Sequence, residues 1–135
     1  ATTLSGNVHE AWNFKGYVFE EIGNQQEALD AYDKAIQIKP DFVIAFNNKG
    51  LLQDTMGNHL EAIETYNKAL TIRPDLDIAW FNKACAEALL SNKEGALSSL
   101  KKAIELNQSF KRIARTNPDF LKIKDDPDFI NVVGN

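Results

Sequence analysis

Hydrophobic residues recur along the chain at the spacing of an α-helix. In residues 8–22 the apolar positions follow one another at intervals of three, four and seven, which places them on one helical face. Residues 26–38 show the same spacing, and Gly23 between the two stretches is typical of a helix end, because glycine adopts the left-handed conformation without strain. Equivalent stretches follow at 42–56, 60–72, 76–90 and 93–106. The pattern therefore predicts helices in consecutive pairs.

These helix pairs recur with a period of 34 residues. Residues 7–40 and 41–74 are identical at thirteen of 34 aligned positions, including a terminal proline, Pro40 and Pro74. Residues 75–108 form a third copy that departs from the pattern at Ala84, Leu100 and Gln108. A fixed period of this length indicates repeated supersecondary units, and terminal units of such an array are often atypical.

The repeated positions resemble tetratricopeptide repeats, a family of helix–turn–helix units. Each copy carries an aromatic residue, a small residue and a turn residue in the family's register, followed in the second helix by alanine, a large residue and alanine. In chain order these are Trp12, Gly16, Gly23, Ala28, Tyr32 and Ala35; Phe46, Gly50, Gly57, Ala62, Tyr66 and Ala69; and Trp80, Ala84, Ser91, Ala96, Leu100 and Ala103. The resemblance covers residues 7–108.

The resemblance implies an all-α fold, a right-handed superhelical α-α solenoid of three helix–turn–helix repeats. Recurrent small residues predict close helix crossings, with Gly16 against Ala28 and Gly50 against Ala62, because glycine in a helix interior costs about 1 kcal/mol and needs a packing reason. The aromatic residue of each repeat is expected in the core. The lysine at the seventh position, as in Lys15, is expected to solvate its ammonium at the edge of the core.

The family implies a binding groove on the inner, concave side of the first helices. The predicted peptide-binding residues are Asn13, Phe14, Tyr17, Asn47, Asn48, Leu51, Ile78, Phe81 and Asn82. Their asparagine amides can pair with the N–H and C=O groups of an extended backbone, or they can simply solvate a helix face. Their apolar members are typical of an interaction surface, although burial against the tail or a second copy is the alternative.

The groove also predicts what kind of partner binds. Relatives that hold acidic chaperone tails use lysine, asparagine and arginine, and of the matching residues here only Asn48 fits. We therefore expect a neutral or basic protein or peptide rather than an acidic C-terminal tail, favoured by groove acids such as Glu20 and Asp54.

Residues 109–135 do not continue the repeats, because Pro118 would occupy a tight position in the middle of a helix. Residues 109–116 are predicted to form a capping helix that turns Phe110, Ile113 and Ala114 toward the third repeat. Two short helices should follow, each with a side-chain cap, proline and a buried phenylalanine. The alternative is a detachable docking arm. The predicted segments are 1–6 (flexible N-terminus), 7–40, 41–74, 75–108 and 109–135.

Composition restricts the function. The net charge of −4 disfavours nucleic acid, which requires a basic surface, and no apolar run is long enough to span a membrane. With a single cysteine, Cys85, the chain can form no internal disulfide, which suits a reducing cytosol. The tail resembles segments that end such arrays in some bacterial proteins, so we expect a cytoplasmic, bacterial protein. Neither His9 nor His59 has a partner at metal-ligand spacing, and no nucleophile or phosphate-binding motif is present.

We therefore expect a non-enzymatic module with no metal or cofactor, acting as an adaptor or assembly factor that binds a protein segment in its groove. The alternative is a structural scaffold that self-associates into a homo-oligomer through its repeat edges or groove. A monomer over a wide concentration range would weaken that alternative.

Overall fold

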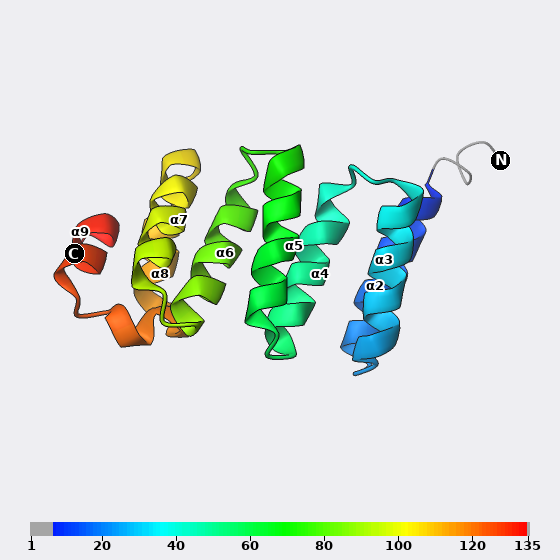
Figure 1. Ribbon diagram of the computed structural model, residues 1–135, viewed down its shortest axis with the longest axis horizontal. Coiled ribbons are helices and arrows are strands. Elements are labelled where there is room, and N and C mark those ends of the chain that lie inside the picture. Colours follow the sequence, from blue (N-terminus) through cyan, green and yellow to red (C-terminus); the bar gives the residue numbers. More distant parts are fainter. Residues whose placement is uncertain (1–6, 135) are drawn as a thin grey trace.

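The computed structural model describes residues 7–134, and these form helices stacked in one row (Figure 1). The predicted flexible segment, residues 1–6, lies outside the described residues. The helices are α2 (Val8–Glu21), α3 (Gln25–Ile38), α4 (Val43–Thr55), α5 (His59–Ile72), α6 (Asp77–Leu89), α7 (Lys93–Leu106), α8 (Phe110–Thr116), η1 (Pro118–Ile123) and α9 (Pro127–Val133). Residues 7–134 contain no strand, so the predicted all-α solenoid is confirmed.

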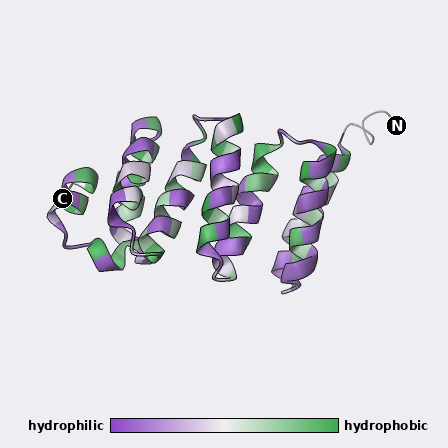
Figure 2. Cartoon of the chain, in the orientation of Figure 1, coloured by the Kyte–Doolittle hydropathy of each residue, from purple (hydrophilic) through white to green (hydrophobic). Residues whose placement is uncertain are grey.

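Consecutive helices pair as hairpins, α2 with α3, α4 with α5 and α6 with α7, and each hairpin packs on the next through α3 against α4 and α5 against α6. The turn residues explain the sharp reversals. Gly23 and Gly57 have φ of 87° and 86°, and Ser91 takes the same left-handed conformation at 64° in the third hairpin. Figure 2 shows hydrophilic residues along the outer side of α3, whose alanines and Tyr32 are buried.

The small residue of each first helix lies against the large residue of the second. A Cβ added to Gly16 would stand 2.6 Å from Cε1 of Tyr32, and Gly50 faces Tyr66 in the same way. The prediction for this crossing named Ala28; the atoms nearest to the added Cβ belong to the tyrosine ring, which the prediction did not include. In the third repeat Leu100 replaces tyrosine, and Ala84 takes the place of glycine.

The core aromatics differ along the row. Phe46, inside the array, is 9% exposed, whereas Trp12 and Trp80 are only partly buried. Trp80 donates a hydrogen bond from Nε1 to the carbonyl of Pro74 at 2.8 Å, and Trp12 lies at the N-terminal end of the row. The repeat aromatic is thus buried in the middle repeat and partly exposed in the first and third.

The tail after α7 belongs to the core of the third repeat. Phe120, Phe129 and Val133 are at most 2% exposed and join one apolar cluster with Leu100 and Phe110. Asn117 and Asp126 cap the two short helices by accepting hydrogen bonds from the N–H of Asp119 (2.8 Å) and Asp128 (2.9 Å), as predicted.

Polar contacts fasten the tail as well. The Lys93 ammonium, at the start of α7, lies 2.9 Å from Asp126 and 3.2 Å from Asp128, and Arg115 donates two hydrogen bonds to the carbonyl of Val133. One detail differs from expectation: Ile113 of α8 is 39% exposed, while its neighbours Phe110 and Ala114 are buried.

Candidate functional site

The candidate site is the side of α2, α4 and α6 that carries Asn13, Asn48 and Asn82, which we call the groove face. Its asparagines pair with one another between helices. Asn48 donates from Nδ2 to Oδ1 of Asn13 at 3.1 Å, and Asn82 donates in the same way to Asn47 at 3.0 Å. The amides therefore tie neighbouring first helices together, a role that the sequence did not reveal.

The third repeat ends this series of asparagine pairs. Phe81 stands where the first two repeats have Asn13 and Asn47. It is 5% exposed, stacks on Phe110 with ring centroids 4.6 Å apart, and meets the edge of Phe120 at 6.0 Å. The structure thus places this predicted site residue beneath the tail, with only a small part of its surface toward the groove.

Most other apolar residues of the groove face are exposed. Phe14 is 66% exposed and Tyr17 is 52% exposed, although both lie beside the paired asparagines. Ile44, Leu51, Ile78 and Leu89 are also exposed on α4 and α6. Each of these side chains keeps more than a third of its surface exposed, so packing within residues 7–134 buries them only in part.

A pocket of 360 Å³ lies at the C-terminal end of the groove face, between α4, α6 and the tail. Its walls combine apolar side chains with two carboxylates and two amides. The lining residues are Leu51, Asp54, Thr55, Phe81, Asn82, Cys85, Leu89, Asn117 and Asp119. The sequence prediction contained Leu51, Phe81 and Asn82 but missed Asn117 and Asp119, because these belong to the tail and only the folded chain brings η1 against α6.

The groove acids have structural partners. Tyr66 donates from its hydroxyl to Asp54 at 2.7 Å, and His59 Nδ1 lies 2.8 Å from the other Asp54 oxygen. Tyr32 donates to Glu20 at the equivalent position of the first repeat. Burial raises the pKa of Tyr32 and Tyr66, and the hydrogen bonds to these carboxylates add to the effect. Both phenols therefore stay protonated donors.

Asp119 lies in a different environment. Burial raises the pKa of its carboxyl above the usual value, and the negative charge of Asp54 raises it further. Among the ion pairs of the described residues, none involves Asp119. A hydrogen bond from Cys85 and the charge of His59 lower the pKa of Asp119 in turn, but they offset the rise only in part. The lining residues of the pocket thus include two carboxylates and no basic side chain.

Cys85 is unsuited to nucleophilic chemistry. It is 7% exposed, and burial raises the pKa of its thiol well above the ordinary value, with the charge of Asp119 adding to the shift. The reactive thiolate is therefore scarce. Across residues 7–134 there is also no group of His, Cys, Asp or Glu side chains that could hold a metal ion, and no helix there is long and apolar enough to cross a membrane.

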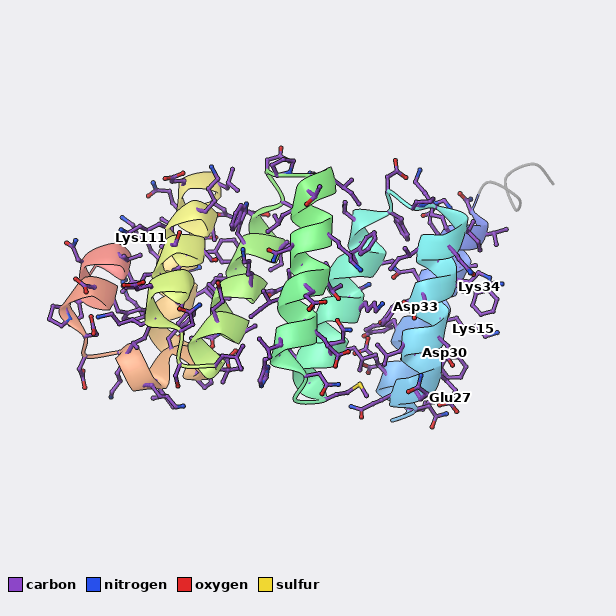
Figure 3. The ribbon with its side chains drawn as sticks, in the orientation of Figure 1. Lys15, Glu27, Asp30, Asp33, Lys34 and Lys111 are labelled. Carbon is purple, nitrogen blue, oxygen red and sulfur yellow. The ribbon has the colours of Figure 1, made fainter. Side chains whose placement is uncertain are left out.

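A second depression, of 370 Å³, lies at the N-terminal end of the row, and we call it the N-terminal edge. It is lined by Trp12, Lys15, Phe19, Glu27, Asp30, Ala31 and Lys34; Figure 3 labels its charged members on α2 and α3. Lys49, the counterpart of Lys15 in the second repeat, instead reaches Asp33 of the preceding hairpin at 2.7 Å. The N-terminal edge thus exposes the surface of the first repeat whose counterpart in the second repeat packs against the preceding hairpin.

Comparison with solved structures finds the same architecture elsewhere. A crystal structure of MamA superposes with a TM-score of 0.71 at 30% sequence identity, covering 77% of this chain and 61% of that one. The first TPR of Spaghetti, bound to the HSP90 peptide SRMEEVD, gives 0.73 at 18% identity with 87% of each chain covered. An O-GlcNAc transferase of Thermobaculum terrenum gives 0.71 at 22% identity, but the match covers only 21% of that chain. The latter two show the fold alone.

This chain thus spans about three fifths of the MamA chain that it matches. A search of curated proteins gave no match. Models of the tetratricopeptide repeat match residues 9–42, 43–76 and 78–110, which together make up most of the chain. The family is in general a non-catalytic scaffold for protein–protein interaction. With its three repeats and stacked helical hairpins, the chain belongs to the tetratricopeptide repeat family.

Proposed function

We propose that this protein–protein interaction module binds an extended segment of a partner protein along the groove face, as an adaptor or assembly factor. The observation that carries the proposal is the exposure of large apolar side chains there, above all Phe14 at 66% and Tyr17 at 52%. A solvated helix face has no need of such residues, and contiguous exposed apolar surface is typical of interaction sites.

The chemistry of the groove face favours a neutral or basic segment. The Spaghetti structure holds an acidic peptide, but the pocket here is lined by Asp54 and Asp119 and by no basic side chain among the described residues. An acidic tail would bring like charges together, which penalises the wrong partner.

The asparagines of the groove face are poor targets for a mutational test, because they also hold neighbouring helices together. Because Asn82 is 8% exposed and bonded to Asn47, replacing it would disturb helix packing as well as any ligand. Phe14 and Tyr17 are better targets. Phe14→Glu combined with Tyr17→Glu should abolish capture of partners that the wild-type chain retains from its native extract.

The control is Leu60→Glu, which replaces one apolar side chain by glutamate on α5 at a residue that is 69% exposed and outside the groove face; Phe14→Glu alone, which adds the same single charge, is compared with it. Partners retained by this control but lost by the groove variant support the proposal. Equal retention by both variants would exclude the groove face as the binding surface.

A second candidate function is self-association through the N-terminal edge. This surface carries both signs of charge, Lys15 and Lys34 with Glu27 and Asp30, around the partly buried Trp12. A patch of mixed charge can be complementary to itself, as a twofold interface requires. At the other end of the row of helices, the tail covers α7. Self-association would therefore pair the N-terminal edges of two copies.

Sedimentation over a wide concentration range tests this candidate. A dimer that dissociates in the Lys15→Glu, Lys34→Glu variant, while Lys68→Glu on α5 has no effect, would support it. A monomer at every concentration would exclude it and leave the groove proposal unaffected.

A further inference from the structure

The pocket between α4, α6 and η1 has a chemical character that the rest of the groove face lacks. Two of its lining residues are carboxylates, and Asp119 comes from the tail rather than from a repeat. Repeat geometry alone therefore does not produce this site; it exists because the tail folds back on α6.

We propose that this pocket binds the side chain of a lysine or arginine on the segment that occupies the groove. The inference rests on the proposed function, because it names the residue that the groove face selects. It concerns one subsite, and groove binding itself is tested separately by the Phe14 and Tyr17 variants.

The walls of the pocket suit the stem of such a side chain. Leu51 and Leu89, which are 41% and 38% exposed, and Phe81, which is 5% exposed, all line it. Lysine and arginine bury their aliphatic stems against apolar surface while their charged ends seek polar partners. At 360 Å³ the pocket is near the lower end of the range of about 300–1,000 Å³ known for ligand sites, which fits one side chain.

The polar groups of the pocket suit the charged end. Asp54 already accepts hydrogen bonds from Tyr66 and His59, which hold its carboxylate in place. Asp119 forms no ion pair with any described residue, and the neighbouring charge of Asp54 disfavours its ionised form. A cation placed between the two carboxylates would relieve this repulsion and give Asp119 an ion-pair partner.

Asn82 provides an observation independent of the acids. Its side chain is 92% removed from solvent (8% exposed) and lines the pocket. Nδ2 donates to Asn47, which fixes the orientation of the amide, and Oδ1 has no hydrogen-bond partner among the described residues. Because no buried side-chain oxygen of the described residues lacks a partner, this Oδ1 is open to the solvent of the pocket and can accept from an ammonium or guanidinium that enters it.

The test uses the whole chain and blocked heptapeptides of the sequence Ser-Ala-Ser-X-Ser-Ala-Ser, acetylated and amidated so that X carries the only charge. X is lysine, arginine, norleucine or glutamate, and binding is followed by ¹H–¹⁵N NMR. The lysine and arginine peptides should shift the side-chain amide of Asn82 and bind at least about tenfold more tightly than norleucine, as expected for a charged hydrogen bond.

Asp119→Asn should reduce the affinity for the lysine peptide to that for the norleucine peptide. Asp125→Asn is the matched control, because it removes the same charge from an exposed tail residue outside the pocket, and it should have no effect. The NMR spectrum of each variant reports directly whether the fold is intact.

The outcomes separate the two proposals. Equal binding of the lysine and norleucine peptides, with shifts along the groove face, would overturn the basic subsite but leave groove binding standing. Tighter binding of the glutamate peptide would overturn the subsite and the charge preference together. Shifts outside the groove face alone, or none with any peptide up to its solubility limit, would overturn both proposals.

Discussion

Gly16 lies directly against the ring of Tyr32, so closely that a Cβ at position 16 would stand 2.6 Å from Cε1. Gly16→Ala should therefore destabilise the chain by about 1–3 kcal/mol, the usual cost of inserting a methyl group into a packed core. The better helix propensity of alanine, worth about 1 kcal/mol, offsets only part of this. Urea unfolding followed by circular dichroism measures the difference.

The third repeat provides the compensating change. There, Ala84 and Leu100 stand at the positions of Gly16 and Tyr32. Adding Tyr32→Leu to Gly16→Ala should therefore recover much of the lost stability. Ala84→Gly is the matched control and should cost about 1 kcal/mol through helix propensity, with the loss of a fully buried methyl group adding to this cost. If Gly16→Ala were as stable as the wild type, the ring would have to move aside freely, and the packing argument would fail.

The fold could be predicted from the sequence because the repeat supplies the same information three times. Turn residues, small residues and alanines recur in register, with Ser91 in place of glycine in the third repeat. The predicted bounds of the repeat helices agree with the structure to within one residue, as at residues 8–22 against Val8–Glu21. The contact of Gly16 with Tyr32 was missed because periodicity identifies which residues face inward but not which pair comes nearest at the crossing.

The site could be predicted only in part. The repeat register placed Asn48 and Asn82 on one surface, and the structure links them to Asn13 and Asn47. Spacing within a helix could not show this pairing, because the partners belong to different helices. Asp119 was missed for a related reason: its position depends on how the tail packs, and no repeat provides a template for it.

The tail should behave as part of the third repeat in unfolding. Phe120 is 1% exposed and packs on Phe129 and Phe81, so Phe120→Ala should cost about 3–5 kcal/mol. Leu121→Ala, at a neighbour that is 60% exposed, should stay within about 0.5 kcal/mol of the wild type. Urea unfolding of both variants, monitored by the fluorescence of the tryptophans, among them Trp80 in the third repeat, measures the two free energies of unfolding.

A detachable arm predicts a different result for the same variants. If the tail came away without disturbing the repeats, Phe120→Ala would leave the main transition unchanged and add a separate early one. A single transition shifted to lower urea for Phe120→Ala is the outcome that the shared apolar cluster requires.

Asp119 should lower the stability of the free protein at neutral pH. Because its folded-state pKa lies above the ordinary carboxyl value, the native state binds this proton more tightly than the unfolded chain does. Stability attributable to Asp119 therefore falls as pH rises from the ordinary value of about 3.9 through the raised pKa. Asp119→Asn, which cannot ionise, should raise the melting temperature at about pH 7.

The gain should disappear in acid, below the ordinary carboxyl pKa, where Asp119 is protonated in both states. Thermal melts of the wild type, Asp119→Asn and the exposed-site control Asp125→Asn across this range give the comparison. A variant less stable than the wild type at neutral pH would mean that the Asp119 carboxylate already has a stabilising partner, contrary to the unpaired charge described for the pocket.

The pocket should also protect Cys85 from thiol reagents. The side chain is 7% exposed, and its pKa is raised by burial and by the charge of Asp119, so both access and thiolate fraction are low. Each unit of pKa lowers the thiolate fraction about tenfold. In the folded chain, labelling with 5,5′-dithiobis(2-nitrobenzoate) should therefore run at least about tenfold more slowly than in urea. Leu89→Ala, which removes part of the pocket wall, should speed it without unfolding the chain. If the folded wild type were labelled as fast as the urea-unfolded chain, α6 and η1 would have to separate readily. A pocket that opens so easily could not hold Asn82 and Asp119 in a fixed arrangement. Recognition of a basic side chain depends on that arrangement.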